Sequence, residues 1–252
     1  MANPTPHQHI FRQFDQELAD IRGNALRLGG LAEEQIALAM KALLGNDGNL
    51  AEQVIGDDRK INELEVSVNN QCLQILARRQ PTASDLRLVV AVIKAINDLE
   101  RIGDEAKNIA RTVLGMSANP PKKHQIAPLA EFAKGVGKLL HDTLDAFARI
   151  DVEAAMQVKQ RDRQLDLQYG DILHEQTTAM SNDPRAIPVA LHIIWAARAL
   201  ERIGDRSCNI CEYAIYYAKG KDIRHMSLEQ AALDLMGQEL ASFVPRVTDG
   251  RA

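Results

Sequence analysis

The chain is poor in aromatic residues and cysteines and has no long apolar run. Aromatics make up 4% of the 252 residues, and good helix formers such as Ala, Leu, Glu, Gln and Arg dominate, so we predict an all-α fold. Three cysteines, an odd number, with no secretory leader pattern at the start, predict a reducing cytoplasm rather than a disulfide framework. No segment reaches the apolar length needed to cross a bilayer, so any membrane contact is expected to be peripheral.

An excess of positive charge is also missing. The formal net charge is −4, which disfavours nucleic acid as a partner. The sequence has no Walker A loop, no GxGxxG, no GxSxG and no HExxH motif, so no familiar catalytic signature is present. We therefore do not expect an enzyme.

What the sequence does contain is an internal repeat. The phrase LERIGD occurs at 99–104 and again at 200–205. A repeat of this kind predicts two tandem units of about a hundred residues related by internal pseudo-symmetry. The likeness extends upstream to three further pairs: Asp58 with Asp162, ND at 46–47 with ID at 150–151, and Pro81 with Pro184.

Each unit has the pattern of three long amphipathic helices joined by short turns, which pack as an antiparallel bundle. We thus predict two three-helix bundles, at 1–117 and 118–222, followed by a C-terminal tail at 223–252. The expected helices span about 13–44, 49–79 and 82–113 in the first unit and 128–149, 151–180 and 185–219 in the second, with a short amphipathic segment at 228–243.

The third helix of each unit carries a stripe of acidic and amide residues spaced four apart, which places them on one side of the helix. Two carboxylates one turn apart repel each other by about 0.2 to 0.5 kcal/mol, and an interior glycine costs roughly 0.8 to 1 kcal/mol more. A bound cation would relieve the repulsion. The first stripe is Glu100, Asp104 and Asn108, and the second is Glu201, Asp205 and Asn209.

We predict that Asp58 and Asp162, on the preceding helices, complete two metal sites. Because all the ligands are oxygen atoms, these sites favour Mg²⁺, Mn²⁺ or iron over a zinc centre of the Cys/His type. Two other interpretations stay open at this point. The stripes are either plain solvated faces or surfaces that dock onto basic patches of a partner.

Other candidate ligands have simpler explanations. Cys208 and Cys211 form a CxxC in a helix interior, where we expect buried thiols, with Cys208 as an extra ligand the less favoured alternative. Asp171 and His174 resemble half of a di-iron motif, but the first unit has no counterpart, so we expect them on the surface. Arg202 is followed one turn later by Arg206 and therefore needs a partner elsewhere, whereas Arg101 can pair with Glu105.

The doubled ERIGD, RRQPTASDLRLV at 78–89, HDTLDAFARID at 141–151 and NICEYAIYYAKGKDIRH at 209–225 together resemble the bacterial PhoU family. The resemblance covers about residues 8 to 225. It implies multinuclear iron or zinc clusters on the E-x-x-x-D stripes, with Glu100 and Asp104 in one site and Glu201 and Asp205 in the other.

The resemblance also implies a cytoplasmic adaptor at the face of the inner membrane. Such a protein links the ATPase subunit of the phosphate-import ABC transporter to the phosphate sensor histidine kinase and holds the starvation response off when phosphate is ample. We also expect a homodimer. The alternative function is a carboxylate-bridged, ferritin-like di-metal enzyme, which normally uses Glu-x-x-His pairs from facing helices.

Overall fold

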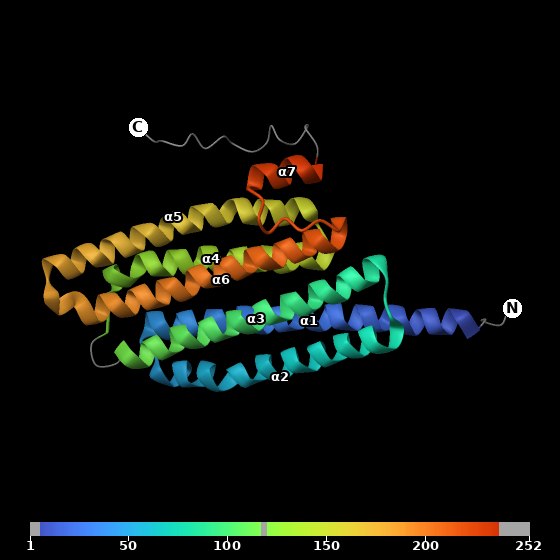
Figure 1. Ribbon diagram of the computed structural model, residues 1–252. Coiled ribbons are helices and arrows are strands. Elements are labelled where there is room, and N and C mark those ends of the chain that lie inside the picture. The colour runs from blue at the N-terminus through green and yellow to red at the C-terminus, as the bar shows by residue number, and fades with distance from the viewer. Residues whose placement is uncertain (1–5, 117–119, 237–252) are drawn as a thin grey trace.

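The computed structural model describes residues 6–116 and 120–236, and the elements in these ranges are helices joined by short turns (Figure 1). The predicted all-α class is therefore confirmed. In chain order the elements are α1 Pro6–Gly45, α2 Gly48–Arg79, α3 Ala83–Met116, α4 Lys123–Arg149, α5 Val152–Asn182, the 3-10 turn η1 Pro184–Ala186, α6 Ile187–Lys219 and α7 Leu228–Met236.

One upstream repeat pair, ND at 46–47 with ID at 150–151, marks equivalent helix starts. Asp47 is the N-cap of α2, and Asp151 is the N-cap of α5; each side chain accepts a hydrogen bond of 3.0 Å from the backbone three residues on. Asn46 and Ile150, one residue before each cap, both adopt a left-handed backbone, with φ of 50° and 57°. The same turn is thus built twice, which explains why the sequence likeness persists there.

Two predicted helix starts were too late. Helix α1 begins at Pro6 rather than near residue 13, and α4 begins at Lys123 rather than at Pro128. Proline usually marks a helix start because it lacks an N–H, yet Pro128 lies inside α4, where packing of the apolar face outweighs the lost bond. The predicted end of the last helix, at 243, falls outside the described residues.

The helices form two antiparallel bundles. Helices α1, α2 and α3 pack on one another, and so do α4, α5 and α6, as the sequence predicted. In Figure 1 the long helices lie roughly side by side, with α2 and α5 on the outside, α3 and α6 in the middle, and α7 against α5. The two bundles meet where α3 packs on α6 and α1 packs on α4.

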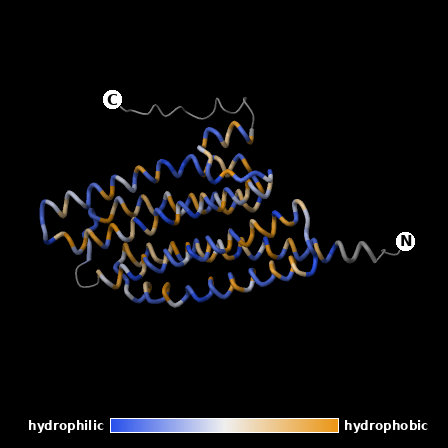
Figure 2. The backbone as a smooth tube through the Cα atoms, in the orientation of Figure 1, coloured by the Kyte–Doolittle hydropathy of each residue, from blue (hydrophilic) through white to orange (hydrophobic). Residues whose placement is uncertain are grey.

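Hydrophobic and hydrophilic positions recur along every long helix (Figure 2). The main apolar core extends through both bundles across the α3–α6 contact, and fully buried Ile102 and Ile203 belong to it. A second, smaller cluster joins α4, α5, α6 and α7. Over the described residues, no helix combines the length and apolar character that a membrane crossing requires.

Helices α3 and α6 run antiparallel and are joined by hydrogen bonds and ion pairs. Arg87 near the start of α3 donates to the carbonyl of Tyr217 near the end of α6. The carboxylate of Asp98 on α3, with 7% of its side chain exposed, accepts from Arg206 at 3.2 Å and from Tyr213 at 2.8 Å. Removing one partner of such a pair leaves the other charge buried and unpaired.

We predict that Asp98→Ala lowers the free energy of unfolding by about 3 kcal/mol, because Arg206 then loses its partner inside the junction between the bundles. Chemical denaturation monitored by circular dichroism measures the change. Asp145→Ala is the matched control, since its pair with Arg149 is more than half exposed on both sides; it should change stability by less than about 1 kcal/mol. Equal effects of the two substitutions would contradict the structural role of Asp98.

Candidate functional site

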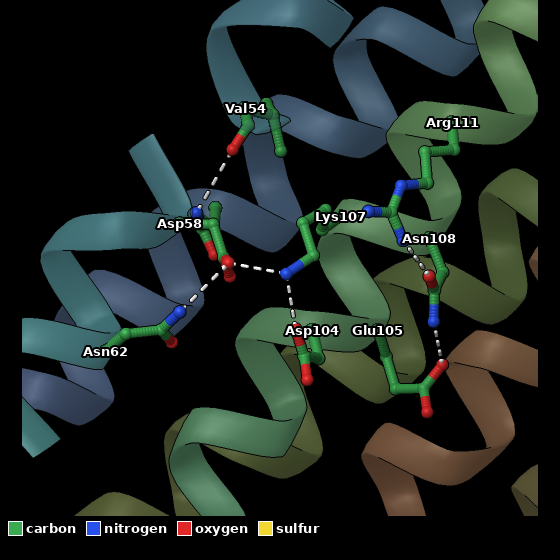
Figure 3. A network of polar contacts seen from close by, with 9 residues as sticks. Val54, Asp58, Asn62, Asp104, Glu105, Lys107, Asn108 and Arg111 are labelled. Atoms are coloured by element: carbon green, nitrogen blue, oxygen red, sulfur yellow. Dashed lines mark hydrogen bonds and ion pairs between the residues drawn. The ribbon is translucent and has the colours of Figure 1, made fainter. Parts of the chain in front are cut away.

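The first stripe lies where α3 packs on α2. Glu100 and Asp104 are half-buried on α3, and Asp58 comes from α2 with 6% of its side chain exposed. The ammonium of Lys107 sits between the two helices (Figure 3). Its Nζ atom is 2.5 Å from Asp58 Oδ2 and 2.5 Å from Asp104 Oδ1. Asp58 and Asp104 therefore share a cation that the chain itself supplies.

Several oxygens around this first stripe lack a partner. Asp58 Oδ1, Asn62 Oδ1 and Gln35 Oε1 are buried and accept no hydrogen bond from the residues that the structure describes. Buried polar atoms are normally satisfied, so these oxygens are available to a further donor or cation. Glu100 is not paired with Lys107, and burial together with the charge of Asp104 raises its pKa.

The glycines of the stripes allow the outer helices to approach closely. A Cβ atom on Gly103 would lie 2.8 Å from Cδ1 of Ile61 on α2. A Cβ atom on Gly204 would lie 3.0 Å from Oδ1 of Asp162 on α5. In the second bundle, the missing side chain of Gly204 thus makes room for the Asp162 carboxylate against the backbone of α6. This close approach explains why a glycine stands there, although glycine weakens a helix.

The second stripe is arranged similarly but carries different charges. Burial raises the pKa of Asp162 to about 6; a hydrogen bond from the Cys208 thiol opposes that rise, while Asp166 and Asp205 add to it. Burial also raises the pKa of Asp205, and the nearby charge of Asp166 adds to the effect. Burial and the charge of Asp205 raise the pKa of Glu201 as well. Within the described chain, no Lys or Arg forms an ion pair with Asp162, Glu201 or Asp205.

A cleft of about 450 Å³ opens beside this second stripe. Asp162 and Asp205 line it together with buried Cys208. The segment before α7 contributes Met226 and Ser227 to its wall. Lys159 and Arg163 line the same cleft, and the charge of Lys159 partly offsets the rise in the pKa of Asp162. Clustered acids with shifted pKa values in a cleft mark a candidate functional site.

The structure thus brings Asp58 and Asp104 together through Lys107. In the second bundle, Asp205 lies close enough to Asp162 and to Glu201 for its charge to raise the pKa of each. Over residues 6–116 and 120–236, however, no three His, Cys, Asp or Glu side chains already stand in an arrangement that could hold a metal ion. Metal binding therefore requires side chains to turn, and the predicted metal sites stay predictions.

The remaining candidates take the simpler roles. All three cysteines are free and buried, and Cys211 lies 3.6 Å from the hydroxyl of Thr143. Asp171 and His174 are exposed, as expected for surface residues. Arg202 finds its partner on α3, where its guanidinium is 3.3 Å from Glu105. The expected pairing of Arg101 with Glu105 is wrong, because Glu105 bonds to Arg202 and Asn108 instead.

Sequence reasoning missed Lys107. It lies three residues after Asp104, a spacing at which helix residues are neighbours, so the pair was visible in the sequence. Its second link, to Asp58 on α2, depends on how α2 and α3 pack. In the repeat alignment the equivalent of Lys107 is Cys208, so the two stripes differ at this position.

We predict that replacing Asp by Asn has opposite effects on stability in the two bundles when it is measured on chelator-treated protein. Asp162→Asn should raise the melting temperature at pH 7, because the ionised carboxylate is disfavoured in the folded state. A pKa of about 6 against an ordinary value of 3.8 means that stability from this group is present below about pH 4 and lost as the pH rises through 6. The gain should therefore vanish below pH 4.

Asp58→Asn is the comparison for that experiment. It removes a carboxylate that is paired with Lys107, so it should lower the free energy of unfolding at pH 7 by about 1.5 to 3 kcal/mol. Thermal and denaturant unfolding at pH 4 and pH 7 measure both variants. The same sign in both bundles at pH 7 would contradict the difference between the stripes.

The chain matches the family model described as "PhoU domain" twice, over residues 25–113 and 129–214. Among curated proteins, it is 45% identical to the phosphate-specific transport system accessory protein PhoU of Serratia marcescens, covering 90% of this chain and 93% of that one. The protein of the same name from Escherichia coli K12 is 41% identical over 92% of this chain and 96% of its own length.

Two solved structures are also similar. The crystal structure of PhoU from Pseudomonas aeruginosa superposes with a TM-score of 0.80 at 44% identity, covering 82% of this chain and all of that chain. The phosphate transport system regulatory protein PhoU from Streptococcus pneumoniae gives a TM-score of 0.77 at 32% identity, covering 83% and 98%. The doubled bundle, the two stripes and these matches agree, and the chain belongs to the PhoU family.

Proposed function

We propose that this chain is a non-enzymatic accessory regulator of phosphate-specific transport that acts in the cytoplasm at the face of the inner membrane. It links the ATPase subunit of the phosphate-import ABC transporter to the phosphate sensor histidine kinase and holds the starvation response off when phosphate is ample. The observation that carries the proposal is the match over more than nine-tenths of the chain to relatives named phosphate-specific transport system accessory protein. These names do not favour the ferritin-like enzyme alternative.

A cleft between α3 and α6 is suited to contact a partner. Its volume is about 410 Å³, and three arginines line it: Arg111, Arg198 and Arg202. Trp195, with 53% of its surface exposed, stands at the same cleft with its ring 5.0 Å from that of His192. Tryptophan and arginine dominate binding energy at protein interfaces. In a chain of net charge −4, this local positive charge favours an acidic segment of the ATPase subunit or of the kinase.

We further propose that the stripes bind a cation that sets the geometry of the adaptor or its assembly as a homodimer. The residues that would hold it are Glu201 and Asp205 with Asp162, and, in the first bundle, Glu100 and Asp104 with Asp58. Support comes from the raised pKa values of the second stripe and from the unpartnered oxygen of Asp58. Iron or zinc follows from the family resemblance, and Mg²⁺ or Mn²⁺ from the oxygen ligands.

The regulatory role is tested with a phosphate-starvation reporter in a strain that lacks this gene. We expect the reporter to be active at high phosphate in the deletion strain and silent again when the gene is restored. Repression that persists at high phosphate without the gene would overturn the assignment. The double variant Trp195→Ala with Arg198→Ala should fail to restore repression, since it removes two anchors of the proposed partner cleft.

Binding of the purified chain to the ATPase subunit and to the kinase tests directly whether the cleft between α3 and α6 contacts a partner. The double variant should weaken the affinity for at least one of them by about tenfold or more, which is about 1.4 kcal/mol. Leu167→Ala, at a residue of α5 that is 72% exposed, is the control and should bind like the unmodified chain. Failure to bind either protein at any phosphate level would refute the adaptor role.

Metal content separates the cation role from simple docking by the stripes. Glu201→Gln with Asp205→Asn should lower the bound metal, measured by elemental analysis after incubation with Fe²⁺, Zn²⁺ or Mn²⁺ and dialysis. If the stripes instead dock onto basic patches of a partner, metal content stays unchanged and partner binding weakens. Redox-active iron that turns over oxygen would revive the enzyme alternative.

A further inference from the structure

We propose that the cleft between α3 and α6 binds a nucleoside polyphosphate, with its base stacked on Trp195 and its phosphates held by three arginines. The arginines are Arg111, Arg198 and Arg202. The cleft volume of about 410 Å³ lies within the range of small-molecule sites. Binding of this ligand is independent of the proposed adaptor role. One consequence rests on that role: the ligand and an acidic segment of a partner would compete for the same arginines.

Trp195 provides an aromatic surface for the base. Its ring meets the ring of His192 at an interplanar angle of 87°, so the histidine can cover at most one face of the indole, and 53% of the residue is exposed. His192 in turn packs against α3, because Gly115 has no side chain: a Cβ atom there would lie 2.7 Å from Cε1 of His192. The indole is thus supported from α3, and its exposed surface is available for stacking, which any base can do.

The arginines lie on the same side of the cleft as the indole. Trp195, Arg198 and Arg202 are spaced three and four residues apart, which places them in a row along one face of α6. At 1.5 Å per residue the row is about 10 Å long, which is comparable with the reach from a base to the outer phosphates of a nucleotide. Arg111 lines the cleft from α3. Each guanidinium group can offer two parallel hydrogen bonds to phosphate oxygens.

Much of this positive charge is not neutralised within the protein. Glu105 is the one acid among the residues that line the cleft, and it pairs with Arg202 at 3.3 Å, yet 47% of the Arg202 side chain is exposed. Arg111 is exposed and bonds through one nitrogen, at 3.2 Å, to the neutral amide of Asn108 (Figure 3). Its charge therefore has no carboxylate partner among the residues that the structure describes.

Arg198 is the least engaged of the three arginines. It is exposed, and within residues 6–116 and 120–236 it forms no hydrogen bond or ion pair; its charge only partly offsets the raised pKa of Glu201. A guanidinium group stays charged at any physiological pH. Arg198 also lies one turn from Trp195, so a ligand stacked on the indole would bring its phosphates directly to this side chain.

The combination of a stacking surface with phosphate-binding groups distinguishes a nucleotide from simpler ligands. Inorganic polyphosphate would use the arginines alone, and a nucleoside without phosphates would use the indole alone. A ligand that carries both groups makes both contacts while it loses its freedom of movement once, so it should bind more tightly than either part.

Trp195 is the only tryptophan of the chain, so its fluorescence reports on this cleft alone. The experiment titrates the purified chain with ATP, adenosine or tripolyphosphate in the presence of EDTA, which keeps divalent cations off the acidic stripes. A tryptophan amide titrated in parallel corrects for light absorbed by adenine. We expect saturable quenching by ATP, with an affinity at least about tenfold higher than that of adenosine or tripolyphosphate.

Calorimetry measures ATP binding to the variants, because it needs no tryptophan. Trp195→Ala and Arg198→Ala should each weaken the affinity by about tenfold or more, since one removes the stacking surface and the other a charged phosphate contact. Trp195→Phe keeps an aromatic face and should lose less than Trp195→Ala. Arg149→Ala, at an exposed arginine of α4, is the matched control and should bind like the unmodified chain. Circular dichroism checks that each variant is folded.

The outcomes separate this site from the adaptor role. Absence of saturable quenching by ATP, equal affinity for ATP and tripolyphosphate, or equal losses from Arg149→Ala and Arg198→Ala would each overturn the nucleotide site. The reporter and partner-binding assays judge the adaptor role independently of these results. Polyglutamate, which stands in for an acidic partner segment, should raise the ATP concentration needed for half-saturation. If it has no effect, the competition is refuted and the nucleotide site stands.

Discussion

The contact of α3 with α6 places both stripes in this protein. The two helices run antiparallel through the centre of the molecule, and the largely buried ion pair of Asp98 with Arg206 crosses between them. Because one face of each helix is used for this contact, its polar stripe faces the outer helix of its own bundle, α2 or α5. The same packing therefore joins the bundles and sets where each carboxylate stripe meets its second helix.

The repeated backbone has been kept while the charges have diverged. Equivalent capped turns start α2 and α5, and equivalent glycines let them approach α3 and α6. On this shared frame the first bundle neutralises its acids internally with Lys107, whereas the second leaves Asp162 with a pKa of about 6 beside a cleft. Two halves of a duplicated fold can in this way share a backbone and differ in their electrostatics.

Most of the fold was predictable from the sequence because its signals are local. Helix periodicity, the N-caps Asp47 and Asp151, and the stop before Pro81 each act within one turn of chain. The errors came where packing overrode a local rule. Pro128 was predicted to start a helix, yet it lies inside α4. Arg101 was predicted to pair with Glu105, but that carboxylate forms its ion pair with Arg202 on α6.

The sequence by itself determined the helices, the duplication, and which carboxylates share a face of one helix, since spacing along a helix is a property of the chain alone. Only the tertiary structure decided the electrostatic state of each stripe. Whether an acid is paired or left without a counter-charge depends on atoms that other helices bring within a few ångströms and on how far water is excluded there. Lys107 reaches Asp58 only because α2 packs on α3, and the half-buried Asp162 approaches the backbone of α6 only because Gly204 has no side chain.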